Sequence, residues 1–168
     1  MFTQPRIEER KAQPYIGIRT QVPMQELSNT ISPLLDEVFA WAEQQGIASV
    51  GAPFIRYHVI NMEGLMDVEI GVPVATPVSG NGRVSQDVLP AGRYAALIYT
   101  GIENGIQGNA ALLDWGAKEG LVWDRWEAEN GDGFGARVEF FLTDPADEPN
   151  PSKWETEVAI RLADHQSR

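Results

Sequence analysis

The feature that most constrains the fold is an internal repeat, because the second half of the chain follows the pattern of the first. One helix-like stretch ends in residues 40–47 (AWAEQQGI), and another ends in residues 114–121 (DWGAKEGL). Residues 69–74 and 157–162 also correspond, since each segment begins with glutamate and continues with apolar residues at every second position. That alternation is typical of a strand with one buried face. We therefore expect one β-α-β-β unit to occur twice.

Apolar periodicity and turn residues predict the same four elements in each half. The first half is expected to contain a strand at 15–20, a helix that begins at a Ser28 cap and ends at Gly46, and strands at 54–60 and 67–74. The second half is expected to contain a strand at 92–99, a helix at 106–119 closed by Gly120, and strands at 137–142 and 156–162. Between these elements we expect a connector at 76–86, a glycine-rich turn at 130–135, and an irregular loop with three prolines at 144–152.

The repeat predicts an α+β fold. A duplicated β-α-β-β unit can form an antiparallel sheet with two helices on one face and a ligand cleft near the pseudo-two-fold axis. We expect a single domain at 14–163, with repeats at about 14–75 and 90–163. Residues 1–13 and 164–168 are expected to be terminal tails. Exposed sheet edges would allow a homodimer.

Composition and charge exclude several classes of protein. The chain has 168 residues, no cysteine, and 13 basic against 24 acidic residues, which gives a net charge of −11. Its basic residues are scattered, whereas a nucleic-acid surface needs clustered Lys and Arg. Without cysteine, the chain has no disulfide, thiolate nucleophile or sulfur-bound metal. The N-terminus is polar and no run of about 18 apolar residues occurs, so we expect a cytoplasmic protein without a membrane span.

Three stretches of the second half resemble the GyrI-like family. Residues 88–101 (VLPAGRYAALIYTG) are similar to the family's LPAGRYAVFRHTG, residues 138–145 (VEFFLTDP) to its YLNDP, and residues 156–160 (TEVAI) to its TEIYIP. The order and spacing agree, and weaker similarity extends from about residue 14 to residue 162.

The resemblance implies a duplicated β-α-β-β fold with a pocket for small molecules. In that family the domain is the effector-sensing part of AraC-type and MerR-type regulators. It also occurs alone, as gyrase-inhibitory proteins, drug-sequestering modules and hydrolases of cyclopropane-bearing DNA alkylators. The family's ligand-contacting glutamate falls on Glu157, and Phe141 stands where the family commonly has tyrosine.

Alternation along the last strand also singles out Glu157. Its side chain should lie on the face opposite the apolar residues of 158–162, where an unpaired carboxylate in an apolar pocket would have a raised pKa and would favour a cation. The alternatives are a solvated carboxylate, or one paired with Arg137 or Arg161. Glu69 is the repeat equivalent of Glu157, and it could either face the same cleft or be an exposed acid.

Aromatic residues supply the other half of a cation site, because ring faces attract ammonium groups. Tyr57 and Phe141 lie on equivalent strands and are the better pocket candidates. Trp115 matches Trp41 on the helices, a position that favours the core but could also line the cleft. The candidate ligand-binding residues are therefore Glu157, Tyr57, Phe141, Trp115 and Glu69.

The sequence shows no catalytic constellation. His58 and His165 are the only histidines, and neither has a partner or a metal-ligand spacing, so we expect no metal, cofactor or catalytic residue. We interpret the chain as a stand-alone module for bulky, cationic or amphipathic small molecules, used in drug sensing or sequestration. The alternatives are a hydrolase of strained, cyclopropane-bearing compounds that uses Glu157 with Glu69 or a tyrosine, and a gyrase-inhibitor-like protein. A homodimer or a separate regulator remains an open choice of partner.

Overall fold

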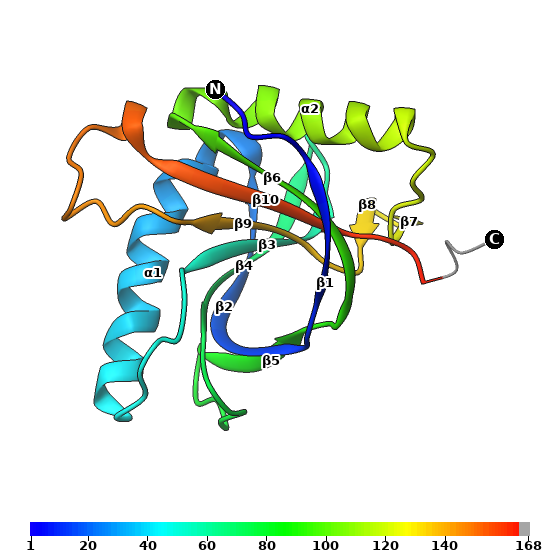
Figure 1. Cartoon of the computed structure of the whole chain (residues 1–168). Helices are drawn as coiled ribbons and strands as arrows, with labels where there is room; N and C mark the ends of the chain where they lie inside the picture. The colour runs from blue at the N-terminus through cyan, green and yellow to red at the C-terminus, as the bar shows by residue number, and fades with distance from the viewer. Residues whose placement is uncertain (165–168) are drawn as a thin grey trace.

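The computed structural model describes residues 1–164, which form one antiparallel sheet and two α-helices (Figure 1). In chain order the elements are β1 (Arg6–Arg10), β2 (Gln13–Pro23), α1 (Leu27–Gln44), β3 (Phe54–Ile60), β4 (Leu65–Pro73), β5 (Ser85–Leu89), β6 (Gly92–Thr100), α2 (Gly105–Lys118), β7 (Arg125–Ala128), β8 (Gly131–Phe134), β9 (Arg137–Phe141) and β10 (Glu155–Arg161). Short 3-10 turns precede α1, α2 and β10 at Met24–Glu26, Ile102–Asn104 and Pro151–Lys153. The α+β prediction is confirmed.

The strand order shows the duplication. The main path of the sheet is β1-β6-β10-β9-β3-β4-β2-β5, so β9-β10-β6-β1 on one side of the centre mirrors β3-β4-β2-β5 on the other. The two halves meet where β3 pairs with β9, in a register that sets Ile55 opposite Glu139. A two-fold axis through that pair relates Tyr57 to Phe141, which places both near the centre of the molecule.

One face of the sheet carries both helices, and we call it the helix face. In the first half α1 packs with Leu34 and Val38 on a cluster that includes Ile55, and in the second half α2 packs with Leu112 on a cluster that includes Val158. Register places Ile55, Glu139 and Val158 in one row across the sheet, so the two helices cover the same face. Within the described residues, no helix has the length and apolar character needed to cross a membrane.

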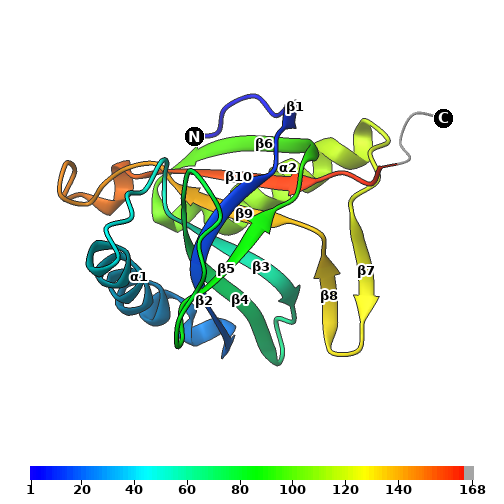
Figure 2. The same ribbon diagram turned by 90° about the horizontal axis from the view of Figure 1, so that it is seen from below.

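The opposite face is curled inward, and we call it the inner face. Only two residues separate β1 from β2, although β1 is one edge of the sheet and β2 lies next to the other. Three residue steps reach at most about 11 Å, whereas β1 and β2, six strand spacings apart, would lie roughly 29 Å from each other in a flat sheet. The sheet must therefore bend, and the curve is visible in Figures 1 and 2. Its inner face is packed with aromatic rings, among them Tyr15 edge-on to Phe54 at 5.0 Å and Phe54 tilted against Phe140 at 5.5 Å.

The N-terminal segment differs from the expected tail at 1–13. Residues 6–10 pair with β6 over five positions, and β2 already begins at Gln13. The strand escaped prediction because its inward positions, Arg6, Glu8 and Arg10, carry charge. Apolar alternation therefore cannot reveal it.

A second difference is the hairpin of β7 and β8, which projects from the sheet beside β3 (Figure 2). The expected glycine-rich turn at 130–135 is in fact mostly strand. Glycine is used there because a Cβ at Gly133 would lie 2.5 Å from the Trp126 ring. The high glycine content of this segment predicted a turn, although most of it is strand.

Smaller differences concern element ends. The first helix begins after a 3-10 turn with no side-chain cap, so Ser28 lies inside it and the expected Ser28 cap is wrong. The strand β5 was not predicted, and its first two residues, Ser85 and Gln86, fall in the expected connector at 76–86. Gly46 and Gly120 follow the helices with positive φ angles of 70° and 73°, as helix-closing glycines do.

We expect Gly71→Ala to destabilise the protein by about 1–3 kcal/mol, the usual cost of overpacking a core. A Cβ at this position would lie 2.7 Å from Phe54 Cζ and 3.1 Å from Tyr15 Cδ1, and both rings are fully buried. Gly51→Ala is the matched control, because its new methyl group would meet only Pro73 Cγ, at 3.3 Å. Urea denaturation of both variants measures the difference, and equal free energies of unfolding would contradict the packing described for Gly71.

Candidate functional site

The structure divides the five predicted site residues between the two faces of the sheet. Tyr57 and Phe141 lie on the helix face near the pseudo-two-fold axis, and Glu157 and Glu69 lie on the inner face. Trp115 lies on α2 and packs against the core of the second half, half-buried. Glu157 therefore cannot share one pocket with Tyr57 and Phe141, because the sheet lies between them.

An acid that the sequence did not single out, Glu139, stands at the centre of the helix face. It is bracketed by Tyr57 and Phe141 on the same face and lies beside Tyr99 of β6. Its carboxylate accepts a hydrogen bond from Asn109 Nδ2 of α2 at 3.0 Å and one from the Tyr99 hydroxyl at 3.4 Å. Tyr57 shares this face, and its hydroxyl is electrostatically coupled to the carboxylate. Helix, sheet and both repeats thus converge on one carboxyl group.

Helix α2 can approach this cluster because two residues of its first turns are glycines, which have no side chain. A Cβ at Gly108 would lie 2.8 Å from Cδ2 of Tyr99, and one at Gly105 would lie 3.2 Å from the Tyr99 hydroxyl. The missing Cβ atoms let the helix backbone rest against the Tyr99 ring. Asn109, the next residue after Gly108, is thereby brought within reach of Glu139.

Burial dominates the electrostatics of the cluster. It raises the pKa of Glu139 above its ordinary value, although bonds from Asn109 and the charge of Arg137 act in the opposite direction. It also raises the pKa values of Tyr57 and Tyr99, and the neighbouring Glu139 adds to both shifts. The two tyrosines therefore stay protonated, and the Tyr99 hydroxyl donates a hydrogen bond to the carboxylate.

Arg137 is the cation nearest in sequence to Glu139, but its guanidinium is engaged elsewhere. It donates to Asn109 Oδ1 at 2.9 Å and lies 4.9 Å from the centre of the Phe134 ring. Burial lowers the pKa of Arg137, and its Nε has no hydrogen-bond partner. Across residues 1–164 no ion pair joins a basic side chain to Glu139, so its carboxylate has no direct cationic partner.

Glu157 is on the face opposite the apolar set of its strand, as alternation predicted, but it is paired. Arg6 Nη2 donates to Oε2 at 2.5 Å and Arg10 Nη2 donates to Oε1 at 2.9 Å, both from β1. The expectation of an unpaired carboxylate is wrong, and so are the two partners suggested for it. Arg137 lies on the other face, and Arg161 is bonded to Asp124 at 2.9 Å. The real partners come from the segment that was expected to be a tail.

Glu69 is also paired and is not an exposed acid, since only 2% of its surface is accessible. Its Oε1 accepts a bond from the Tyr15 hydroxyl at 2.5 Å and contacts His58 Nε2 at 2.9 Å. Burial opposes ionisation of Glu69, but the bonds from His58 and Tyr15 outweigh it and lower its pKa. Arg56 Nη1 donates to the Tyr15 hydroxyl at 2.8 Å and completes the chain. His58 thus has a carboxylate partner, although the sequence suggested none.

No group of three or more His, Asp or Glu residues within 1–164 could hold a metal ion. His165 lies outside the described residues. The chemistry that these groups offer is therefore ionic, hydrogen-bonding and aromatic. The pattern that could have revealed Glu139 is the alternation of β9, because a residue two positions before Phe141 must share its face.

A duplicated β-α-β-β unit with a half-buried acid and aromatic rings between its helices defines a small-molecule-binding domain. The chain belongs to the GyrI-like family of small-molecule-binding domains, whose model matches residues 3–163. No curated protein matches the chain.

Solved structures with a similar fold include EcmrR in a cryo-EM structure of its DNA complex. The likeness has a TM-score of 0.74 at 18% identity and covers 96% of this chain, which spans 57% of the length of that EcmrR chain. SAV2435, solved with bound tetraphenylphosphonium, has a TM-score of 0.65 at 11% identity, with 98% of each chain covered. A hydrolase from Listeria innocua has a TM-score of 0.65 at 12% identity, with 95% of this chain and 92% of that chain covered. At these identities the likeness concerns the fold.

Replacing Glu139 with glutamine should change how stability depends on pH. The pKa of Glu139 in the folded state lies above the ordinary value of 4.5. Its protonation therefore stabilises the folded wild type fully below pH 4.5, and this stabilisation is lost as the pH rises through the raised pKa. Glutamine cannot ionise. The free energy of unfolding of Glu139→Gln should therefore increase relative to wild type from acid to neutral pH, as measured by urea denaturation. Glu155→Gln, at an exposed position, is the control. A difference for Glu139→Gln that does not vary with pH would refute the raised pKa.

Proposed function

We propose that the domain binds an amphipathic organic cation between α1 and α2, with Glu139 as its counter-charge. The observation that carries the proposal is the carboxyl group of Glu139 at the centre of the helix face, among Tyr57, Tyr99 and Phe141. Within residues 1–164 it has no direct cationic partner. This assignment replaces Glu157, whose oxygens are already held by Arg6 and Arg10.

The energetics favour a cationic ligand over a neutral one of the same shape. Ionising a buried carboxylate is costly, and the raised pKa of Glu139 is the measure of that cost. A cation that reaches the carboxylate lowers the free energy cost of ionising Glu139. Part of the binding energy therefore comes from this lowered cost. Aromatic faces add about 0.5–2 kcal/mol for each well-placed ring. A neutral analogue gains the apolar contact but not the ionic part.

The site retains a route for a ligand. Glu139 and Phe141 both keep some accessible surface, whereas Tyr57 and Tyr99 are almost fully buried. A ligand would therefore contact Glu139 and Phe141 first and reach the tyrosines after side chains move. Trp115 is a candidate for the wall on the α2 side.

The biological use that fits best is sensing or sequestration of such compounds in the cytoplasm. SAV2435, which shares the fold, has been solved with the lipophilic cation tetraphenylphosphonium. EcmrR, which also shares it, has been solved on DNA. Residues 1–168 contain no basic cluster for DNA, so any DNA contact would come from outside this domain.

Isothermal titration calorimetry with tetraphenylphosphonium tests the proposal. We expect Glu139→Gln to weaken binding by about tenfold or more, which is roughly 1.4 kcal/mol. Glu157→Gln removes an acid from the other face and serves as the matched control, with affinity expected to stay within about twofold. Triphenylphosphine oxide, a neutral compound of related shape, should be almost insensitive to Glu139→Gln. Equal losses in the two variants, or a loss confined to Glu157→Gln, would contradict the assignment of Glu139.

A second candidate function is hydrolysis of a strained electrophile, and one observation favours it. Burial raises the pKa of Glu139, and a carboxyl group with a raised pKa suits a general acid. Turnover of a cyclopropane-bearing alkylating agent, followed by mass spectrometry, measures this activity. We expect any turnover to be lost in Glu139→Gln, and the absence of turnover at high protein concentration would exclude hydrolysis of that compound.

A further inference from the structure

A cavity of about 360 Å³ opens on the inner face, away from Glu139. It lies beneath the link between β1 and β2 and is bounded by the loop before β3 and the ends of β4 and β5. Its lining includes Arg10, Lys11, Leu89, Tyr94, Val138 and Phe140. That volume lies within the range of about 300–1,000 Å³ that is usual for small-molecule sites.

The charge of the lining is opposite to that of the whole protein. Two of the lining residues, Arg10 and Lys11, are basic and none is acidic, whereas the chain as a whole has a net charge of −11. The rest of the wall is mainly apolar, with the aromatic rings of Tyr94 and Phe140 on one side. An apolar chamber with cations at one end fits a molecule that is itself apolar with one anionic end.

The two basic side chains have different roles. Arg10 is fixed, because it bonds to Glu8 and Glu157 and lies 5.4 Å and 5.8 Å from the ring centres of Tyr94 and Phe140. Its charge is therefore already neutralised. Lys11 is exposed, and none of the residues in 1–164 forms a hydrogen bond or ion pair with its ammonium group. Among the residues that the structure describes, Lys11 is therefore the unpaired basic residue of the cavity lining.

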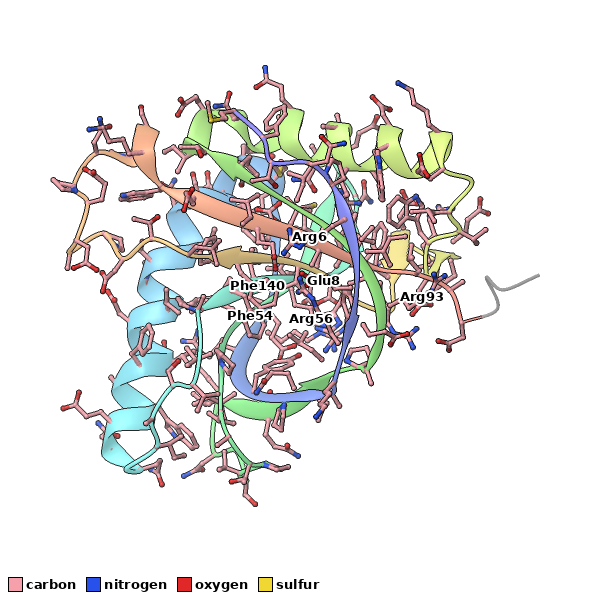
Figure 3. All side chains as sticks on the ribbon, in the orientation of Figure 1. Arg6, Glu8, Phe54, Arg56, Arg93 and Phe140 are labelled. Carbon is pink, nitrogen blue, oxygen red and sulfur yellow. The ribbon has the colours of Figure 1, made fainter. Side chains whose placement is uncertain are left out.

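Deeper on the same face lies Arg56, whose Nη1 is 3.9 Å from Asp87 Oδ2. It lies opposite Val138 in the sheet, is 8% exposed, and donates to the Tyr15 hydroxyl and to two backbone carbonyl groups. Its buried Nε has no hydrogen-bond partner. Figure 3 shows Arg56 near Phe54 and Phe140, within the curve of the sheet.

The geometry points to a second binding site, one that takes a small amphipathic carboxylate. Its apolar body would lie against Phe140, Tyr94 and Leu89, and its carboxylate would pair with Lys11. This inference is independent of the proposed cation site, because the two sites lie on opposite faces of β9. Val138 and Phe140 face the cavity, whereas Glu139 faces the helices.

Calorimetric titration of the full chain with 2-naphthoate tests the second site, with 2-naphthamide as its uncharged counterpart. We expect naphthoate to bind more tightly than naphthamide. Lys11→Gln should weaken naphthoate binding about two- to fivefold, the size of one exposed ion pair, and should leave naphthamide unaffected. Lys153→Gln, which removes an exposed lysine outside the cavity, is the matched control. Glu139→Gln should leave naphthoate binding unchanged, which separates this test from that of the cation site.

Methyl NMR spectra locate the bound probe. Naphthoate should shift the methyl signals of Val50, Leu89 and Val138, which line the cavity, more than those of Leu97 and Leu112 on the helix side. The inference is overturned if naphthoate does not bind at millimolar concentration, or if naphthamide binds equally well. It is also overturned if the shifts centre on Leu97 and Leu112, or if Lys11→Gln and Lys153→Gln behave alike.

Discussion

The pairing of β3 with β9 is the constraint on which the rest of the molecule depends. It is the only join between the two half-sheets in the main strand path, and its register decides which side chains of each half share a face. With Ile55 opposite Glu139, the row that includes Val158 faces the helices, and Phe54 faces Phe140 on the inner side. A shift by one residue would send every one of these side chains to the other face. The apolar clusters under α1 and α2 and the aromatic stack of the inner face oppose such a shift together.

The carboxylates of the two faces differ in whether they are paired with cationic side chains. On the inner face, Glu157 and Glu69 are each held by two partners, and for Glu69 the bonds to His58 and Tyr15 overcome the effect of burial. On the helix face, Glu139 has hydrogen bonds but no ion pair with any residue of the described range 1–164, and burial raises its pKa. A structural acid is satisfied within the fold, whereas an acid that is left short of a partner is a better candidate for binding something from outside.

Much of the fold could be read from the sequence because its signals are local. The repeat, the apolar periodicities and the glycines after each helix predicted both helices and six strands, with errors mostly at their ends. What failed was long-range or atypical. The strand at Arg6–Arg10 carries inward charges that make sense only beside Glu157, which lies about 150 residues away in the chain. The pairs of Glu69 with His58 and Tyr15 likewise depend on register. Glu139 could have been found, because it lies two positions before Phe141 and so shares its face. Its proximity to Arg137 in the sequence instead makes it look like an ordinary charged pair.

The asymmetry of the central pair shows what joining two repeats in one chain allows. A dimer of identical units must place the same residue on both sides of its axis. The two positions that face each other across the axis therefore carry either two acids or none. Two carboxylates at the spacing of a cross-strand pair, about 5 Å, would repel each other and share one proton. Fusion removes that restriction, since Ile55 and Glu139 occupy equivalent places with different chemistry. A single charge at the centre of a nearly symmetric scaffold is therefore a property that covalent duplication makes accessible and that self-association of one repeat could not supply.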